Sequence, residues 1–429
     1  MITRFEESEH LASPEFDLDP PGFVWSWFLR NSRPNGVGLR RWQSWIWWSR
    51  QRGPAAKVMA AVRLVRGFVE APIEVLRGVR QYGGKTVLVY GVPYTAQFRQ
   101  LLRLRWQYGV RPESYYKFQM FRPERFHDAP NFVDECGQLL QVLFRRTKRT
   151  KDWNIFLSKE SFREWCIEKG LSVVGSLLIA KDGAVVARYV DALPAQDIFV
   201  KPTNWITGKG TSRWNYRLLE EGGRYVDNAG QKMTAAALED FVCRSTVEVG
   251  RPYLVQPALM NHSSLRFVTN GALATLRIMT TRRRGKSSRP LMAALRMPTG
   301  DAVADNFDLG GVAAPVDIES GTCGVGGRKK NGYPPDPVRK HPDTGKVIVG
   351  LQIPWWEECV DLVCRAHDVL EADVPVIGWD VAVLDDGPVL IEANHLPGAS
   401  IAQMPGGLAL GATEFSEAVC ERLRGAFLV

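Results

Sequence analysis

The sequence predicts a mixed α/β or α+β protein with a basic, mainly helical region at its N-terminus. Three observations support this prediction. The chain has 429 residues, more than one hydrophobic core usually organises, so two or three domains are expected. Residues 21–151 contain 24 Lys and Arg against 7 Asp and Glu, a net charge of +17, whereas the rest of the chain carries −8. After about residue 155, segments with strand character alternate with helix-like segments.

Composition argues against several classes of protein. Apolar residues make up 45% of the chain, which is ordinary for a globular protein. The seven cysteines form no C-x-x-C pair and the six histidines show no zinc-finger spacing, so reduced cytoplasmic thiols are expected. The first residues form no apolar leader, and no apolar run reaches ~18 residues. We expect a cytoplasmic protein without a transmembrane helix, and membrane association stays open.

The first 50 residues differ in amino-acid composition from the rest of the chain. Residues 1–20 are acidic and contain proline, so a poorly ordered tail is expected. Residues 22–50 mix arginines with the tryptophans Trp25, Trp27, Trp42, Trp45, Trp47 and Trp48. Three interpretations stay open: a helical cap whose tryptophans pack in a core, peripheral contact with anionic lipid, or contact with an acidic polymer or nucleic acid. The aromatic positions form no RNA-recognition signature, so nucleic acid is an unfavoured partner.

Residues 55–80 place apolar side chains at helical spacing, which predicts an amphipathic helix or helix pair. The apolar positions are Val58, Val62, Val65, Phe68 and Val69, and the arginines among them are Arg63, Arg66, Arg77 and Arg80. Residues 97–151 continue helix-like and basic. These two segments carry the prediction of a helical N-terminal region.

Strand-like segments follow residue 155, with helices between several of them. The strand-like segments are residues 172–180, 197–202, 253–259, 274–280, 347–353, 376–384 and 389–393. The helix-like segments include residues 234–247 and 356–370, and a short helix begins at residues 158–162. Strands and helices mixed with antiparallel turns are typical of α+β or mixed α/β proteins.

Residues 378–394 contain the most informative pattern. Two apolar runs flank Asp385-Asp386-Gly387, which predicts a β-hairpin. Glu392 and Asn394 are two residues apart on one strand and therefore point to the same face. A three-residue loop would place Asp380 opposite Glu392 on that face, whereas a two-residue loop would place it opposite Ala393 on the other face.

Two carboxylates and one amide oxygen on one face suit magnesium, which prefers hard oxygen ligands. Crowded acceptors on apolar strands would repel one another unless a cation lay between them. The alternative is that Asp380, Glu392 and Asn394 simply face solvent at a sheet edge.

A second pattern surrounds Lys201. Residues 199–202 form a strand that ends near this lysine, and a loop with Gly208 and Gly210 follows. A lysine at a strand end can contact phosphate oxygens, and glycines let backbone N–H groups approach them. The loop lacks the residues of a Walker A motif, which requires glycine at Thr203 and Ser or Thr at Gly210. An ordinary surface hairpin is the alternative.

Taken in order, these segments resemble the sugar-transfer associated family of ATP-grasp enzymes. The matching segments are Lys159, residues 199–202 with Gly208 and Gly210, residues 254–257, residues 275–280, residues 305–307 with Gly310 and Gly311, residues 378–380, and residues 390–394. Each motif is short, but their joint order and spacing are specific. The resemblance covers about residues 155–400 and implies an ATP-grasp fold, in which two α+β lobes clamp ATP.

The resemblance also implies roles for matching positions in ATP binding. Lys159 and Lys201 would hold the ATP phosphates, and the loop 204–210 would fold over them as a lid. The lid residues that would contact the nucleotide are Gly208, Lys209 and Gly210, and the residues that would line the adenine are Gln256, Pro257 and Leu259. Relatives often carry Asp-Lys at the first lysine, whereas Ser158 precedes Lys159 here.

The remaining roles concern catalysis and metal. Arg277, together with Lys201, would stabilise the transferring phosphoryl group or the oxyanion that follows. Asp380, Glu392 and Asn394 would hold two Mg²⁺ ions. With these roles, we expect a Trp-rich helical region at 1–85, a connecting region at 86–155, a lid lobe at 156–255, and a C-terminal lobe with the magnesium site at 256–429.

The implied activity is that of an ADP-forming ligase that activates a carboxylate as an acyl phosphate. An amine, a thiol or a sugar-linked nucleophile would then attack, in polysaccharide or secondary-metabolite biosynthesis. Two alternatives stay open: a kinase-like ATP-grasp phosphotransferase, and a non-catalytic protein that binds membranes or acidic polymers and retains a nucleotide fold. The intact set of Lys201, Asp380, Glu392 and Asn394 argues against the second.

Two further features have open interpretations. The basic run at residues 282–286 could form an anionic acceptor site beside the phosphates or a solvated charged loop. Asn261, His262 and Ser263 could reach the ribose, although a lone histidine is more often structural.

Overall fold

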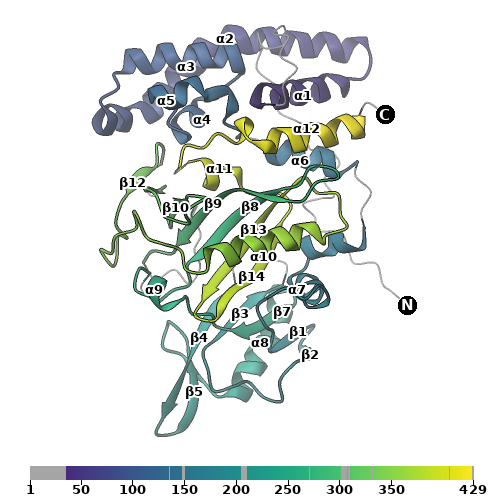
Figure 1. Cartoon of the computed structure of the whole chain (residues 1–429), viewed down its shortest axis with the longest axis vertical. Helices are drawn as coiled ribbons and strands as arrows, with labels where there is room; N and C mark the ends of the chain where they lie inside the picture. The colour runs from purple at the N-terminus through teal and green to yellow at the C-terminus, as the bar shows by residue number, and fades with distance from the viewer. Residues whose placement is uncertain are drawn as a thin grey trace.

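The computed structural model describes residues 35–134, 136–146, 150–203, 210–269, 271–300, 307, 310–329, 332–404 and 406–427. Gly208 and Lys209 of the expected lid loop, residues 305–306 and the first two tryptophans lie outside this part of the chain. Figure 1 shows a helical region at one end, a large sheet in the middle and a second sheet at the other end. The expected mixture of α and β structure with an N-terminal helical region is confirmed.

The N-terminal region is a stack of helices. They are α1 (Gly36–Ser49), α2 (Pro54–Tyr90), α3 (Tyr94–Tyr108), α4 (Pro112–Lys117) and α5 (Pro123–His127). Helix α2 begins with Pro54 in its first turn, where the missing N–H costs nothing, and ends at Gly91 in the left-handed conformation. The division at residue 85 stays a prediction, and α2 runs continuously through that position.

Helix α2 buries a different face from the one that its valine spacing suggests. Its buried residues are Ala60, Leu64, Ala71, Val75, Gly78, Val79, Gly83 and Thr86. Val58, Val62, Val65 and Val69 are exposed instead. A Cβ at Gly78 would overlap Pro112 of α4, so small residues on the buried face admit neighbouring helices closely. Close packing against α4 therefore selects which apolar face is covered.

Helix α1 partly confirms the interpretation that the tryptophans pack in a core. Trp47 is buried, and Trp42 and Trp48 pack against the largest hydrophobic cluster of the protein. Trp45 is 43% exposed and meets Trp42 edge to face. No described helix is long and apolar enough to cross a membrane.

The chain then forms two short helices, α6 (Cys136–Phe144) and α7 (Lys159–Glu168), and enters a seven-stranded antiparallel sheet. The strand order is β2-β1-β7-β3-β4-β5-β6. The strands are β1 (Leu178–Lys181), β2 (Ala184–Arg188), β3 (Ile198–Pro202), β4 (Ser212–Leu219), β5 (Gly222–Val226), β6 (Lys232–Met233) and β7 (Tyr253–Pro257). Helix α8 (Ala235–Val249) packs on this lid sheet and shares a core with it.

The second sheet, which we call the central sheet, also has seven antiparallel strands, in the order β12-β11-β10-β9-β8-β13-β14. They are β8 (Thr275–Thr281), β9 (Arg289–Met297), β10 (Val312–Val316), β11 (Gly326–Arg328), β12 (Asp336–Val338), β13 (Val376–Leu384) and β14 (Gly387–Asn394). Helices α10 (Trp356–Asp368) and α12 (Glu414–Phe427) contribute to the same core as its central strands.

Two strand predictions are wrong in part. Residues 172–177 precede β1, and Ser172 and Val174 hydrogen-bond the backbone of Leu390 at the edge of the central sheet. Residues 347–353 form only isolated bridges, because Gly350 at φ +82° breaks the extended run. The chain thus passes from the edge of the central sheet directly into the lid sheet.

Candidate active site

Charged side chains line up across three neighbouring strands of the central sheet. Asp380 on β13 is paired directly with Arg277 on β8 and with Glu392 on β14. Directly paired residues on antiparallel strands project from the same face, so these three form one row. The residues next to Arg277 on β8 and next to Asp380 on β13 are buried and apolar, and they project from the opposite face of the sheet.

The predicted pairing of Asp380 with Glu392 is present, but the hairpin achieves it differently from the prediction. Leu384 pairs with Gly387, so the turn has two residues, not three. The register then shifts between the pairs Val381–Leu390 and Asp380–Glu392, which leaves Ile391 as an extra residue. This β-bulge restores the shared face that a two-residue turn alone would have lost.

Asp380 is held by two arginines. Arg277 Nε lies 2.5 Å from Asp380 Oδ1, and Arg296 contacts Oδ2 at 3.0 Å. All three side chains are about nine-tenths buried. Burial alone would raise the pKa of Asp380, but the charges and hydrogen bonds of both arginines outweigh it and lower the pKa below its usual value.

Arg296 is a site residue that the sequence did not indicate. It lies on β9, paired with Thr275, and also donates a hydrogen bond to the Thr275 hydroxyl at 2.6 Å. Thr275 is two residues from Arg277, so Arg296 sits diagonally across from that arginine on the same face. Finding it required the order β9-β8-β13, which no local motif encodes.

Lys201 reaches the same site from the lid sheet. It is buried near the end of β3, and its pKa is lowered to about 8. Burial and the like charge of Lys159 lower this pKa, and Glu392 and Asp380 oppose the shift. Glu392 and Asp380 of the central sheet are thus the carboxylates whose charge acts on the Lys201 amine.

Lys159 joins this cluster from the start of α7. Its amine lies 3.8 Å from Glu392 Oε2 and donates to the carbonyl of Thr203. Ser158 before it is the helix cap and accepts a hydrogen bond from Ser161 N. Serine is favoured at this cap position, because its hydroxyl can accept the hydrogen bond of a free backbone N–H.

Asn394 completes the set of oxygen donors on this face. It follows Glu392 by two residues on β14, and its amide nitrogen is buried without a hydrogen bond to any described atom. Rotation of the amide by 180° would exchange this nitrogen for the oxygen. Two carboxylates with an otherwise unsatisfied amide therefore fit a hard divalent cation such as Mg²⁺.

Comparison with known proteins decides the family. The family model described as "Sugar-transfer associated ATP-grasp" matches residues 141–420. The chain belongs to this family. No curated protein matches the chain.

Solved structures of two ligases are similar at a low level. An L-amino acid ligase from Bacillus licheniformis is 14% identical with a TM-score of 0.35, over 62% of this chain and 48% of that protein. A D-alanine–D-alanine ligase from Helicobacter pylori is 12% identical with a TM-score of 0.36, over 67% of both chains. This chain thus spans about half the length of the first of these proteins.

The segment expected to line the adenine of an ATP-grasp enzyme connects the two sheets. Gln256 is buried, and its side chain donates to the carbonyl of Gly175 at 3.2 Å. Pro257, which pairs with Ile198 at the end of β7, is half-buried, and so is Leu259 two residues beyond it. Gly210, the described end of the lid loop, is exposed with φ +68°.

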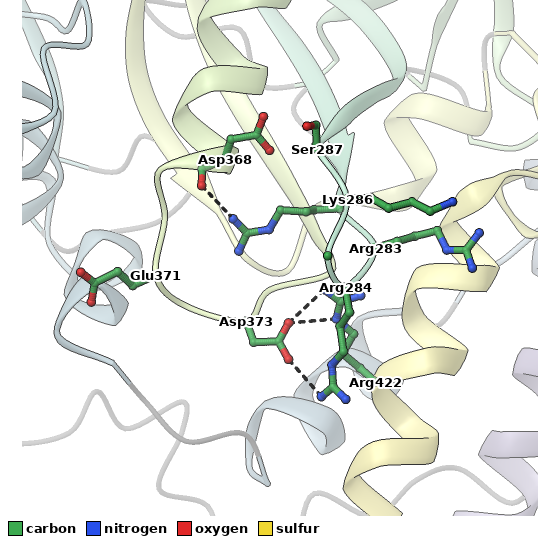
Figure 2. A pocket seen from close by; sticks show the side chains of 10 residues that line it. Arg283, Arg284, Lys286, Ser287, Asp368, Glu371, Asp373 and Arg422 are labelled. Atoms are coloured by element: carbon green, nitrogen blue, oxygen red, sulfur yellow. Dashed lines mark hydrogen bonds and ion pairs between the residues drawn. The ribbon is translucent and has the colours of Figure 1, made fainter.

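The basic run after β8 lies away from the ATP-grasp carboxylates, and its arginines are largely neutralised. Arg277 is near the start of β8, whereas Arg282 follows its end, roughly 17 Å along the strand. Arg282 donates to backbone carbonyls after α10, and Arg284 pairs with Asp373. Residues of this run line a cavity of about 620 Å³. Figure 2 shows Asp373 between Arg284 and Arg422, with which it forms ion pairs, whereas Glu371 lies apart from the arginines. The structure does not place an anionic acceptor site beside the carboxylates here.

The residues after the adenine segment have structural roles. Asn261 is buried and exchanges hydrogen bonds with the backbone of Ala274. His262 accepts a hydrogen bond from Ser264 N and caps α9 (Ser263–Arg266). Asp385 of the hairpin turn binds the backbone of Ser263 and the side chain of Arg266. These contacts anchor α9 to the hairpin. They give Asn261, His262 and Ser263 structural roles that do not require contact with a ribose.

Proposed function

We propose that this protein is an ADP-forming ligase that activates a carboxylate with ATP and joins it to a nucleophile. The observation that carries this proposal is the row of Arg277, Asp380 and Glu392 on the central sheet. Lys159 lies 3.8 Å from Glu392, and the charges of both carboxylates act on the buried amine of Lys201. A site that combines fixed cations with oxygen donors suits phosphoryl transfer, because that reaction depends on positioning and on neutralising charge.

The charge of the site favours a polyanion. Four basic side chains, Lys159, Lys201, Arg277 and Arg296, surround two carboxylates, Asp380 and Glu392. The six groups together carry +2 when all are ionised. ATP phosphates would be attracted by this excess and would add negative charge beside the buried amine of Lys201.

Magnesium would be held by Asp380, Glu392 and Asn394, with remaining ligands from phosphate oxygens and water. When bound, Mg²⁺ supplies neutralisation of the phosphate oxygens during transfer. Arg277 and Arg296 both lower the pKa of Asp380 and so favour the ionised form that would bind Mg²⁺. Two ions and the full donor set remain part of the proposal.

The proposed reaction has two balanced steps. A carboxylate oxygen of the acid attacks the γ-phosphorus of ATP, the bond to the β,γ-bridging oxygen breaks, and ADP leaves with an acyl phosphate formed. The nucleophile then attacks the acyl carbon, orthophosphate leaves with the C–O bonding pair, and the nucleophile loses one proton. Arg277, whose guanidinium group contacts Asp380, would stabilise the negative charge that develops in either step.

The test separates a ligase from a kinase. Full-length protein with Mg·ATP is screened against carboxylic acids crossed with amines, thiols and amino sugars, and ADP release is measured. A ligase forms ADP, orthophosphate and a joined product only when both substrates are present, because the site excludes water. Positional isotope exchange at the ATP β,γ-bridge with the acid alone would report the reversible first step.

A kinase gives a different result. A stable phosphorylated compound would accumulate, with no joined product for any nucleophile tested. That outcome would replace the ligase proposal and leave the ATP site intact. Absence of ATP binding by the folded protein would contradict both.

A further inference from the structure

The outer face of α2 is apolar although nothing in the described part of the chain covers it. Six large apolar side chains on this face are exposed: Val58, Val62, Val65, Val69, Ile73 and Leu76. Their spacing of three and four residues places them in one line along the helix, which we call the outer stripe. Val69, in the middle, is 67% exposed. The outer stripe is about 27 Å long, since 18 residues of helix separate its ends.

Basic side chains border the outer stripe along one edge. Arg66, Arg77 and Arg80 are exposed and lie at or beside the stripe on the helical wheel, and the exposed Arg63 lies further round on the same side. The helix contains only two acidic residues, Glu70 and Glu74. Glu70 is paired with Arg66 at 2.8 Å, and Glu74 is paired with Arg105 of α3 at 2.9 Å. The edge therefore presents positive charge beside an apolar line.

We infer that α2 is a membrane-surface helix whose outer stripe enters the interface of an anionic lipid bilayer. An apolar line with arginines at its edge is the pattern of a helix that lies in the plane of a membrane, where the apolar side chains reach the acyl boundary and the arginines meet lipid phosphates. Long arginine side chains can reach the headgroups while their methylene groups stay near the acyl chains. Helix α2 does not need to cross the bilayer for this role.

The position of α2 in the fold suits such docking. It lies along the outer edge of the helical region in Figure 1, at the end of the molecule opposite the β4–β5 hairpin of the lid sheet. Its inner face is occupied by α3 and α4, so the helix cannot rotate to hide the outer stripe without losing that packing. A bilayer under α2 would leave the lid lobe on the solvent side.

Charge argues against an antiparallel pair of α2 helices from two copies of this chain as the arrangement that covers the stripe. Two identical helices that pack antiparallel through the outer stripe would bring the same edges together, arginines against arginines. Such like-charge contact is unfavourable in a buried interface. Anionic lipid instead supplies charge of opposite sign along the whole edge.

The test is co-sedimentation of the full-length protein with vesicles. One set contains phosphatidylcholine only, and the other contains equal amounts of phosphatidylcholine and phosphatidylglycerol. We expect binding to the anionic vesicles that weakens as salt is raised. Val65→Gln/Val69→Gln should lower the partition coefficient at least about tenfold, since two exposed valines lose their apolar transfer. Arg77→Gln/Arg80→Gln should lower it about fivefold per arginine, because each contributes ~1 kcal/mol at an anionic surface.

A matched control makes the same chemical change elsewhere. Val186→Gln/Leu218→Gln alters two valine- or leucine-sized side chains that are 59% and 82% exposed on the lid sheet, and it should bind vesicles like the original protein. Thermal unfolding of all variants checks that the fold is kept. Failure of the original protein to sediment with anionic vesicles would overturn the inference. Equal vesicle binding by Val65→Gln/Val69→Gln and the original protein would also overturn it. A third contradicting result would be a dimer of the original protein in sedimentation velocity, absent in that variant, without vesicle binding.

Discussion

The affinity for ATP should fall steeply as the pH rises from 7 to 9, because Lys201 loses its proton in this range. Its pKa is lowered to about 8 by burial and by the charge of Lys159, against the opposing effect of Glu392 and Asp380. Only the protonated amine attracts phosphate, and with this pKa the protonated fraction is about 0.9 at pH 7 and about 0.1 at pH 9. The affinity of the free protein for ATP should therefore drop about tenfold between these pH values. Because phosphates favour the charged amine, binding near pH 9 should also take up close to one proton.

Calorimetric titration with Mg·ATP at pH 7, 8 and 9, in buffers with different ionisation enthalpies, measures both the affinity and the proton uptake. Lys201→Arg keeps its charge throughout this range and should make the affinity nearly independent of pH. Lys232→Arg, an exposed change on β6, should keep the tenfold drop. An unchanged affinity from pH 7 to pH 9 in the original protein, or a drop that persists in Lys201→Arg, would refute the assignment of Lys201 to the phosphates.

Three further predictions test other parts of the account. Replacement of the loop 204–210 by a short Gly-Ser linker should leave the protein folded but raise wasteful ATP hydrolysis or end turnover, as measured by ADP release; coupled turnover like that of the original protein would remove the lid role. Arg296→Ala leaves the buried Asp380 with one arginine and should lower the unfolding free energy by about 1–3 kcal/mol in denaturant titration, and an unchanged midpoint would contradict this. Gly78→Ala should lower the unfolding free energy by roughly 1–3 kcal/mol, because the added methyl group overlaps Pro112. Gly67→Ala on the same helix meets no atom and should raise the unfolding free energy by about 0.5–1 kcal/mol. Equal changes in unfolding free energy for the two variants would contradict the packing of α4 on α2.

The candidate site could be predicted from sequence wherever neighbours in the chain become neighbours in space. The hairpin of β13 and β14 brings Asp380 and Glu392 together within one local motif, and the acceptor pattern marks them. Even there, the turn residues do not predict the bulge at Ile391, because the register at that point depends on the packing of the whole sheet.

Arg296 could not be predicted in the same way. It reaches Asp380 across β8, and strand order is a property of the whole sheet. The face of α2 that is buried posed a similar difficulty, since the helix carries apolar residues on two sides. The close contact between Gly78 and Pro112 decides between them, and that contact joins different helices.

The central claim is that Asp380, Glu392 and Asn394 hold magnesium for ATP turnover, and Glu392→Gln tests it most directly. This change removes one anionic ligand but keeps the size of the side chain. We predict that ATP turnover at saturating substrate falls on the order of 10²-fold or more, that ATP binding loses its dependence on Mg²⁺, and that the circular dichroism spectrum is unchanged. Glu220→Gln, an exposed carboxylate on the lid sheet, should behave like the original protein. Near-original turnover by Glu392→Gln, with ATP binding still dependent on Mg²⁺, would contradict the claim.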